Sequence, residues 1–412
     1  MLYSFLIEIS LLLLRVVALF SKKIAHFLSV RIHILDTIQE KINPSDRVLW
    51  FHCASLGEFE QARPLIVAAK KEYPNHKIVL TFFSPSGYEV QKKYSLVDVV
   101  TYLPLDRKKS IKRFIEILQP EALFLIKYEF WPNLIKVLKS QNVPIFSISS
   151  IFRRKQLFFK PHGTFMRRLL KEIDFFFVQN EESKKLLSTI GIANTSVIGD
   201  TRIDRVLEVL NQNNIDRLIE GFIKGQECFV VGSSWREDLE IISNTIESKQ
   251  NLKTIIAPHN VDEKSLQAVE SLFDKPIIRC SELSKTTNSE ADILLIDCVG
   301  ILTKIYSYAT IAYVGGGMGD KGLHNTLEPA VFGIPVLIGK NYLRYQEATD
   351  LVSLGGIKSI DTADAFKNVF SDVLKNKDLQ EKMGTINLNY IKSQAGATTK
   401  VISKLKQVLM SK

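Results

Sequence analysis

The sequence lacks the residue clusters that mark several common protein classes. Its four cysteines, Cys53, Cys228, Cys280 and Cys298, form no C-x-x-C pair and have no histidine cluster beside them, so neither a disulfide framework nor a zinc site is indicated. No D-x-D-like pair of acids stands out in the C-terminal half, and no fixed-period repeat or low-complexity tract is present. We therefore expect no metal and no cofactor, and a catalytic part that faces the reducing cytoplasm.

The chain length and the excess of basic residues indicate how many domains and what kind of partner to expect. At 412 residues the chain is expected to form about two or three units, each with its own core. Lys and Arg number 54 against 44 Asp and Glu, a formal net charge of +10. This excess favours an anionic partner such as nucleic acid, anionic lipid or a phosphorylated substrate, although a merely basic soluble protein remains an alternative.

Long unbroken apolar runs are also missing, even at the apolar N-terminus. Sixteen of the first twenty residues are apolar, but Glu8 and Arg15 limit the longest run to five. On a helix, Ser4, Glu8, Arg15 and Lys22 fall on one narrow stripe. The basic residues follow the apolar stretch, which does not fit a cleaved signal peptide. We expect an uncleaved anchor over residues 1–25 with its basic flank in the cytoplasm; spanning, interfacial and buried-helix arrangements stay open.

Short β-branched runs alternate with helical stretches from about Asp46 onward. A polar stretch at 211–225 interrupts the alternation, which then restarts. This pattern predicts two Rossmann-like, doubly wound α/β domains, over 26–210 and 211–395, that face each other across a cleft and bind ligands at the carboxyl ends of their strands. The predicted strands are 48–54, 77–83, 96–104, 122–128, 143–150, 174–180, 227–234, 253–260, 275–282, 292–300, 310–317 and 334–340.

The first candidate site lies where strand 48–54 turns into a helix, in the sequence HCASLGEFE. Ser55 and Glu58 have the S-x-x-E spacing of a capping box, so Glu58 has a purely structural interpretation. The functional interpretation is that a carboxylate in the first helical turn, at the edge of a ligand site, accepts a proton from a hydroxyl nucleophile.

A second acid, Glu129, directly follows strand 122–128. It stands in the sequence KYEFWPN, beside Lys127 and ahead of a Trp–Pro pair that is expected to begin a helix. A salt bridge between Lys127 and Glu129 and a site carboxylate are equally good interpretations of this pair.

A basic, aromatic segment follows at 151–171. It carries Arg153, Arg154, Arg167 and Arg168 between phenylalanines, which suits an anionic membrane surface. No nucleic-acid-binding module accompanies it, so we expect no nucleic acid partner. A solvated helix face is the alternative.

The fourth candidate is a glycine loop, GGGMGDKGLHNTLEPAVFG. Gly317, Gly319 and Gly322 match G-x-G-x-x-G, but the loop does not open a first βαβ unit and no acid closes the next strand, so a dinucleotide site is not favoured. The loop instead predicts an anion site at the start of a helix over 324–332. Glu328, about one turn into that helix, is placed to accept hydrogen bonds from the two hydroxyls of a ribose. An ordinary turn and helix would explain the glycines, but not Asn325 and Glu328 together.

Taken together, these motifs resemble the Kdo (3-deoxy-D-manno-octulosonic acid) transferases over nearly the whole chain. The resemblance rests on SLGE at 55–58, YEFWPNL at 128–134, QNEES at 179–183, GDTRID at 199–204, GSS at 232–234, APH at 257–259 and GLHNTLEPA at 322–330. It implies a glycosyltransferase of the two-Rossmann B type with an acceptor-binding first domain, a CMP-Kdo-binding second domain and a last helix, 396–412, that crosses back. The implied reaction is an inverting, metal-independent transfer of Kdo from CMP-Kdo to the lipid A precursor at the inner membrane.

The same resemblance assigns roles to individual residues. It implies that Glu58 is the general base, Glu129 a second acid of the site and Arg202 a partner of the donor's carboxylate or phosphate. The residues implied to bind CMP are Ser233, Ser234, His259, Gly322, Asn325 and Glu328. Two other classes stay open on the sequence alone, a non-catalytic anionic-lipid-binding membrane protein and, on the three loop glycines, a dinucleotide-dependent oxidoreductase.

Overall fold

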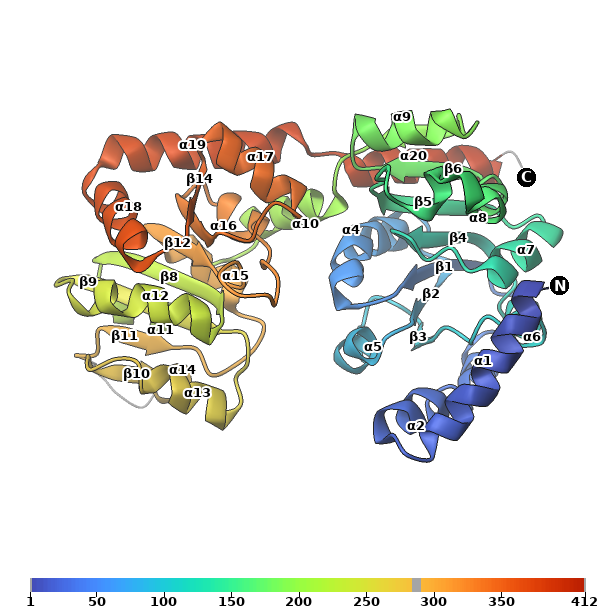
Figure 1. Ribbon diagram of the computed structural model, residues 1–412, viewed down its shortest axis with the longest axis horizontal. Coiled ribbons are helices and arrows are strands. Elements are labelled where there is room, and N and C mark those ends of the chain that lie inside the picture. The colour runs from blue at the N-terminus through green and yellow to red at the C-terminus, as the bar shows by residue number, and fades with distance from the viewer. Residues whose placement is uncertain (1, 284–289, 411–412) are drawn as a thin grey trace. The chain divides into compact units, whose positions relative to one another are not determined.

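The computed structural model describes residues 2–283 and 290–410 and divides into two compact units. Unit 1 comprises Met1–Arg205 with Gln394–Lys412, and unit 2 comprises Val206–Ser393. Each unit contains a seven-stranded parallel sheet with helices on its faces (Figure 1). The predicted fold class, two Rossmann-like doubly wound α/β domains, is confirmed.

The sheet of unit 1 has the strand order β3-β2-β1-β4-β5-β6-β7. Its strands are β1 (Val48–Cys53), β2 (Lys77–Phe82), β3 (Val99–Tyr102), β4 (Pro120–Ile126), β5 (Ile145–Ser150), β6 (Phe175–Val178) and β7 (Thr195–Val197). Its helices are α1 (Leu2–Ala18), α2 (Lys22–Ser29), α3 (Ile34–Lys41), α4 (Leu56–Glu72), α5 (Pro85–Gln91), α6 (Lys108–Leu118), α7 (Pro132–Ser140), α8 (Thr164–Leu170), α9 (Glu181–Thr189) and α20 (Ala397–Met410), with short 3₁₀ turns η1 (Leu157–Phe159) and η2 (Pro161–Gly163).

Strand β1 shows why this sheet is buried on both faces. All six of its residues are buried, as expected for the centre of a parallel sheet. Leu49 and Phe51 belong to the core formed with α4 and α20. Val48 and Trp50, on the opposite face, pack in the core formed with α3, α6 and α7. Because successive side chains of a strand point to opposite faces of the sheet, β1 packs against helices on both sides.

Unit 2 repeats this plan with the order β10-β11-β9-β8-β12-β13-β14. Its strands are β8 (Glu227–Ser234), β9 (Leu252–Pro258), β10 (Ile277–Arg279), β11 (Ile293–Leu295), β12 (Ile311–Val314), β13 (Val336–Gly339) and β14 (Ile357–Ile360). Its helices are α11 (Arg217–Ile223), α12 (Arg236–Glu247), α13 (Glu263–Glu270), α14 (Cys280–Leu283), α15 (Leu302–Ile305), α16 (Leu327–Ala330), α17 (Gln346–Leu354), α18 (Ala363–Lys375) and α19 (Lys377–Ser393), with the 3₁₀ turn η3 (Tyr306–Tyr308). Helix α10 (Thr201–Leu210) runs from unit 1 into unit 2.

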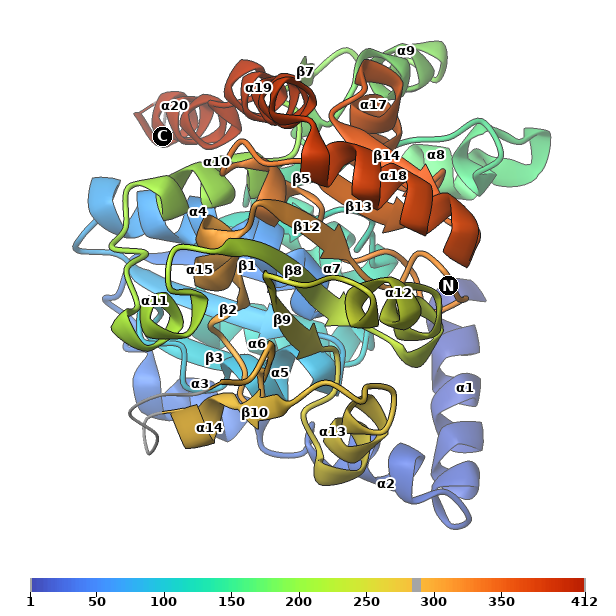
Figure 2. The same ribbon diagram turned by 90° about the vertical axis from the view of Figure 1, so that its left-hand side faces the viewer.

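One face of the second sheet is covered by α12, α13 and α18, which are turned toward the viewer in Figure 2. Phe229 of β8 packs on Phe366 and Phe370 of α18, with ring centroids 6.0 and 4.7 Å apart. Aromatic side chains thus fill the space between strand and helix, where each contributes a large apolar area.

All twelve predicted strands are present, and two strands were not predicted. The unpredicted strands, β7 and β14, are the outermost strands of their sheets. Both are short and carry half-buried or exposed residues, so neither shows the continuous apolar run by which the other strands were recognised.

Two polar residues near the start of helix α1 contact the rest of unit 1, and most of the apolar side chains of this helix are exposed. Ser4 Oγ donates to Asn133 Oδ1 at 2.9 Å, and Glu8 forms an ion pair with Arg107 at 2.8 Å. The exposed apolar side chains of this segment are Phe5, Leu6, Ile9, Leu12, Leu13, Val16, Val17, Leu19 and Phe20. Leu11 is buried, but most of the other apolar side chains of α1 are exposed, so the alternative of a buried core helix is wrong. Within the described ranges, no helix is both long enough and apolar enough to cross a bilayer.

The last helix, α20, packs on α4 in unit 1. Ala397, Val401 and Leu405 are buried in the same core as α4. The carboxylate of Asp204 accepts hydrogen bonds from the backbone N–H groups of Gly396 and Thr398 at 2.7 and 2.6 Å. Because these N–H groups lie at the unsatisfied start of α20, Asp204 fixes where that helix begins.

Candidate functional site

Glu58 lies in the first turn of α4, just beyond the carboxyl end of β1. Its Oε2 accepts a hydrogen bond from the backbone N–H of Ala54 at 2.5 Å. Ser55 is the N-cap residue, but its side chain makes no capping hydrogen bond. The predicted capping box, in which Ser55 and Glu58 each bind the other's backbone N–H, is therefore wrong. Glu58 instead accepts from the N–H of Ala54, the residue before the N-cap.

The environment of Glu58 favours its neutral form more than water does. Burial raises the pKa of Glu58, the hydrogen bond from Ala54 opposes this, and the negative charge of Glu129 raises it further. The charge of Lys127 acts in the opposite direction but does not reverse the shift. A carboxylate with a raised pKa is a stronger proton acceptor than an ordinary glutamate.

Glu129, after β4, is held by an imidazole and an indole. His52 Nε2 lies 3.4 Å from its Oε2, and Trp131 Nε1 donates to the same oxygen at 2.9 Å. Burial alone would raise the pKa of Glu129, but these two partners outweigh it and lower the pKa below the usual range. Glu129 is therefore ionised, with partners other than Lys127, so the salt-bridge interpretation of that pair is wrong.

His52 is fixed in turn by β2. Its Nδ1 lies 2.9 Å from Thr81 Oγ1, which also accepts a hydrogen bond from Trp50 Nε1 at 2.8 Å. These buried groups all belong to the central strands β1 and β2. The network orients Glu129 from within the sheet, which a single sequence motif does not reveal.

Arg202 is tied to a buried acid at the start of α10. Asp200 accepts hydrogen bonds from Arg202 Nη2 at 2.7 Å and from Gln179 Nε2 at 3.3 Å. Gln61 of α4 also donates to Asp200 at 3.2 Å. Burial raises the pKa of Asp200, but the charge and hydrogen bonds of Arg202 outweigh it and lower the pKa. The structure thus holds the Arg202 guanidinium in one orientation.

The arginines of the basic segment 151–171 do not form one exposed surface. Arg153, Arg154 and Arg168 are exposed, whereas Arg167 is half-buried. The Arg167 guanidinium donates to backbone carbonyls of η1 and η2, including Lys160 O at 2.5 Å. Arg167 therefore closes the turns around α8 and belongs to the fold rather than to an exposed patch.

In unit 2, β8 ends in a strained turn that carries Ser233 and Ser234. Ser233 has φ +52°, a left-handed conformation that is uncommon for residues other than glycine. Ser234 is 3% exposed, and its Oγ finds no hydrogen-bond partner within the part of the chain that the structure describes. A buried hydroxyl without a partner is costly, and such groups often serve a ligand.

Asp238, near the start of α12, organises the glycine loop. Its Oδ2 accepts from the N–H groups of Trp235 and Gly316 at 2.9 and 2.8 Å, and its Oδ1 accepts from Tyr313 Oη at 2.9 Å. Gly315 lies so close to this turn that a Cβ would meet Ser233 O at 2.4 Å. The carboxylate therefore joins the ends of β8 and β12.

The loop glycines have packing roles that do not need a dinucleotide. A Cβ on Gly317 would lie 2.9 Å from the backbone of Gly339, at the end of β13. Gly322 has φ +99°, which favours glycine. The close approach of a neighbouring strand end thus accounts for Gly317, and a positive φ accounts for Gly322.

Three rings stack beside this loop. His259, after β9, lies over Trp235 with centroids 4.3 Å apart, and His324 lies 4.7 Å from His259. Burial and the neighbouring His259 lower the pKa of His324 to about 4, and burial lowers the pKa of His259. Both imidazoles are therefore neutral at pH 7, which matches the hydrogen bond that His324 Nε2 accepts from Trp235 Nε1 at 3.2 Å.

Glu328 and Asn325 are brought together as the sequence predicts. Asn325 Nδ2 donates to Glu328 Oε1 at 3.1 Å, and Thr303 Oγ1 donates to Oε2 at 3.2 Å. The expected helix over 324–332 is wrong in length, since α16 spans only Leu327–Ala330. One helical turn supplies little dipole, so any anion affinity here must come from side chains and loop amides.

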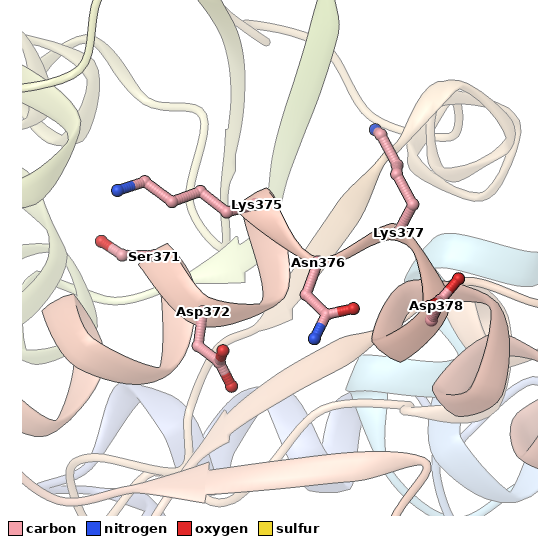
Figure 3. A pocket seen from close by; sticks show the side chains of 6 residues that line it. All are labelled: Ser371, Asp372, Lys375, Asn376, Lys377 and Asp378. Carbon is pink, nitrogen blue, oxygen red and sulfur yellow. The ribbon is translucent and has the colours of Figure 1, made fainter.

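A hollow of about 670 Å³ at the α18–α19 junction contains none of these groups (Figure 3). Its labelled side chains point in different directions. Asn376 accepts a hydrogen bond from Leu379 N at 3.0 Å, and Lys377 forms an ion pair with Glu227 at 2.7 Å. These contacts cap α19 and fix it to the sheet, so Asn376 and Lys377 have structural roles there.

Sequence reasoning missed five residues that shape these sites. They are His52, Asp200, Trp235, Asp238 and His324. Asp238 had a usable signal, since an acid three residues after Trp235 at a strand-to-helix junction fits a capping position. The others owe their roles to contacts between segments far apart in the chain.

The two doubly wound units define the fold class, the two-Rossmann type known as the glycosyltransferase B fold. The UDP-GlcNAc 2-epimerase of Neisseria meningitidis, solved with UDP-GlcNAc, shares the fold with a TM-score of 0.62 and 17% identity over 89% of this chain and all of that one. The family model described as 3-deoxy-D-manno-octulosonic-acid transferase (kdotransferase) matches residues 29–205.

Two related proteins show to which family the chain belongs. The 3-deoxy-D-manno-octulosonic acid transferase of Aquifex aeolicus is 30% identical over 308 residues, covering 73% of this chain and 78% of that protein. The enzyme of the same name from Haemophilus influenzae is 28% identical over 385 residues, covering 89% and 88%. The chain belongs to the Kdo transferase family.

The role of Asp238 is testable by stability. Asp238→Asn replaces an acceptor oxygen with a donor that faces backbone N–H groups, so it should lower the free energy of unfolding of unit 2 by roughly 1–3 kcal/mol. Tyr313→Phe removes only one donor and should cost less. Urea denaturation followed by circular dichroism measures both; equal losses, or none, would show that the carboxylate does not organise the loop.

Proposed function

We propose that this protein is an inverting, metal-independent glycosyltransferase that moves Kdo from CMP-Kdo to a primary hydroxyl of the lipid A precursor, lipid IVA, in lipopolysaccharide synthesis. The observation that carries this proposal is Glu58, a carboxylate with a raised pKa at the carboxyl end of β1, in a chain of the Kdo transferase family. Residues 26–210 would bind the acceptor and residues 211–395 the donor.

Glu58 is proposed as the general base. It would take the proton of the attacking hydroxyl as that oxygen bonds to the anomeric carbon of Kdo, while the bond to the CMP phosphate breaks on the opposite face. One displacement of this kind inverts the anomeric centre. Glu129 stays ionised beside His52 and Trp131, and its charge keeps Glu58 basic. Glu129 is thus proposed as a site acid that tunes the base.

The nucleotide is proposed to bind the loops of unit 2. Glu328, oriented by Asn325 and Thr303, is suited to accept hydrogen bonds from the two ribose hydroxyls. The buried, unpartnered hydroxyl of Ser234 is suited to a phosphate oxygen, with Ser233 and Gly322 shaping the loops around it. His259 is neutral and stacked on Trp235, so it is proposed to contact the nucleoside rather than to neutralise charge.

Charge that develops on the leaving CMP needs stabilisation. Arg202, held by Asp200, is proposed to face the donor's carboxylate or phosphate. Preorganised cations and backbone donors are effective because they need no reorientation during the reaction. This arrangement supports a transfer that does not require a metal.

We further propose that the protein works at the cytoplasmic face of the inner membrane, with α1 lying in the interface. An apolar helix face of this kind inserts into the boundary of headgroups and acyl chains. Phe165 of α8 stacks on Tyr3 of α1 with centroids 6.1 Å apart, so the exposed Arg168 belongs to the same side of unit 1 as this helix. Arg153, Arg154 and Arg168 would attract anionic headgroups, whereas Arg167 would not.

The reaction itself is tested by mass spectrometry. Lipid IVA incubated with a CMP-Kdo source and the purified protein should gain one or more Kdo residues and release CMP. If the lipid mass is unchanged while a known Kdo transferase modifies it in parallel, the proposed function is wrong.

The first prediction concerns Glu58. Glu58→Gln keeps an oxygen that can accept the Ala54 N–H bond but cannot take a proton, so turnover should fall by roughly 10²–10⁴ while stability stays near wild type. Glu60→Gln, in the same helix, is the matched control and should keep its turnover. A Glu58→Gln enzyme with more than about a tenth of wild-type turnover would exclude a general base here.

The second prediction concerns pH. A general base must be deprotonated, so activity should fall as pH drops through the pKa of Glu58, which burial and Glu129 raise above the ordinary glutamate range. Glu129→Gln removes a negative charge, lowers that pKa and should move the acid limb of the kcat/KM profile to lower pH. Glu89→Gln, on the surface of α5, should leave the limb in place. A shift to higher pH would contradict the assignment.

The third prediction concerns the nucleotide. Glu328→Ala should weaken CMP binding by about 1–3 kcal/mol through loss of charged hydrogen bonds, with the fold intact. Calorimetry measures this, with Asp364→Ala on α18 as an exposed control. Unchanged CMP affinity in a folded Glu328→Ala protein would remove Glu328 from the site.

The fourth prediction concerns the membrane. Leu12 and Leu13 are 63% and 60% exposed on α1, and replacing both with Glu should weaken binding to anionic vesicles by more than about tenfold, since burying one leucine contributes roughly 1.5–3 kcal/mol. The control is Val90→Glu, which replaces an apolar residue of α5 that is about equally exposed. It should leave vesicle binding unchanged. Vesicle flotation that is equal for both variants would show that α1 does not insert.

A further inference from the structure

Two cysteines that are far apart in the sequence meet in unit 2. Cys280 begins α14 directly after β10, and Cys298 follows shortly after β11. Because β10 and β11 are adjacent parallel strands, their carboxyl ends lie at the same edge of the sheet. The fold thus pairs side chains that show no metal-binding spacing in the sequence.

An acid completes the group. The Sγ atoms of Cys280 and Cys298 and a carboxylate oxygen of Asp297 all lie within 4.8 Å of one another. Cys280 is half-buried and Cys298 is exposed, so the group is open to small solutes. We refer to these three residues as the Cys280 cluster.

Asp297 is held in place by the residue next to Cys280. Ser281 donates to it twice, from its backbone N–H at 3.1 Å and from its hydroxyl at 2.5 Å. A carboxylate has more acceptor positions than these two bonds use. Hydrogen bonds from an outer residue that orient a ligating carboxylate are a regular feature of protein metal sites.

We propose that the Cys280 cluster binds a soft divalent cation of the zinc class, with two thiolates and one carboxylate as ligands and water in the remaining position. Zn²⁺ takes tetrahedral sets of sulfur and oxygen ligands, and thiolates select it over Mg²⁺ or Ca²⁺. Zn–S bonds of about 2.3 Å place two sulfur atoms roughly 3.8 Å apart in such a set. Atoms already within 4.8 Å reach this geometry with small side-chain rotations.

The position of the cluster gives the cation a structural role. Strand β9 lies between β11 and β8, so the cluster is separated from Ser234 and the glycine loop by a whole strand. The cation would tie the ends of β10 and β11, which pair over only three residues. It takes no part in the proposed transfer, which needs no metal.

The probe is Cd²⁺, added to the full-length, reduced and chelator-treated protein. Binding should saturate at one equivalent with a cadmium–thiolate charge-transfer band in the ultraviolet. Cys280→Ser and Cys298→Ser should each remove most of the band. Ser281→Ala keeps both thiols and the backbone N–H bond to Asp297 but removes the hydroxyl bond that helps to orient the carboxylate, so it should keep the band and weaken binding by roughly 10–100-fold. Zn²⁺ should raise the melting temperature of the wild type but not of Cys298→Ser.

Cys228→Ala is the matched control. It removes a buried cysteine of the same unit that lies outside the cluster and should leave the cadmium band unchanged. The proposal is overturned by three results: no saturable band at one equivalent, a band that survives in Cys298→Ser, or isolation of the protein with Cys280 and Cys298 joined as a disulfide. None of these outcomes bears on Kdo transfer, which the mass-spectrometric assay tests separately.

Discussion

Parallel strand pairing is the constraint on which both units depend. In a parallel sheet every strand delivers its carboxyl end to the same edge, and whatever follows the strands collects there. Glu58 follows β1 and Glu129 follows β4, its neighbour in the sheet. In unit 2, Ser234 ends β8 and His259 follows β9, while the glycine loop follows β12. The candidate residues come together because of this pairing, although they are scattered along the chain.

Three carboxylates, two buried and one half-buried, fix the starts of helices and loops. Asp106 accepts from the first N–H groups of α7 and from Tyr3, so it joins α1 to the sheet domain. Asp204 does the same for α20, and Asp238 for the glycine loop. Burying a charge is costly unless donors surround it, and each of these acids has at least two backbone donors. The cost is offset because the same bonds satisfy amides that helix starts and turns leave open.

Helix α1 shows how little an apolar segment reveals about its orientation. Ser4 and Glu8 contact Asn133 and Arg107, and Leu11 is buried. Most of the other apolar side chains of α1 are exposed, unlike those of a helix that packs its apolar face on a core. Hydropathy gives the same periodic pattern for both orientations, so only the partners on α7 and at Arg107 decide which face points outward.

The sequence by itself determined the fold class, twelve strands and the grouping of the main motifs, because β-branched runs and turn residues act locally. It also placed Glu58 in the first helical turn after β1, and Asn325 and Glu328 at the start of a helix after the glycine loop. It did not determine the partner of Glu58, the ionised state of Glu129, the short length of α16 or the two outermost strands. The pairing of Cys280 with Cys298 was equally hidden. Each of these depends on groups brought close by sheet pairing or on removal from water, and both are properties of the tertiary structure that no local pattern encodes.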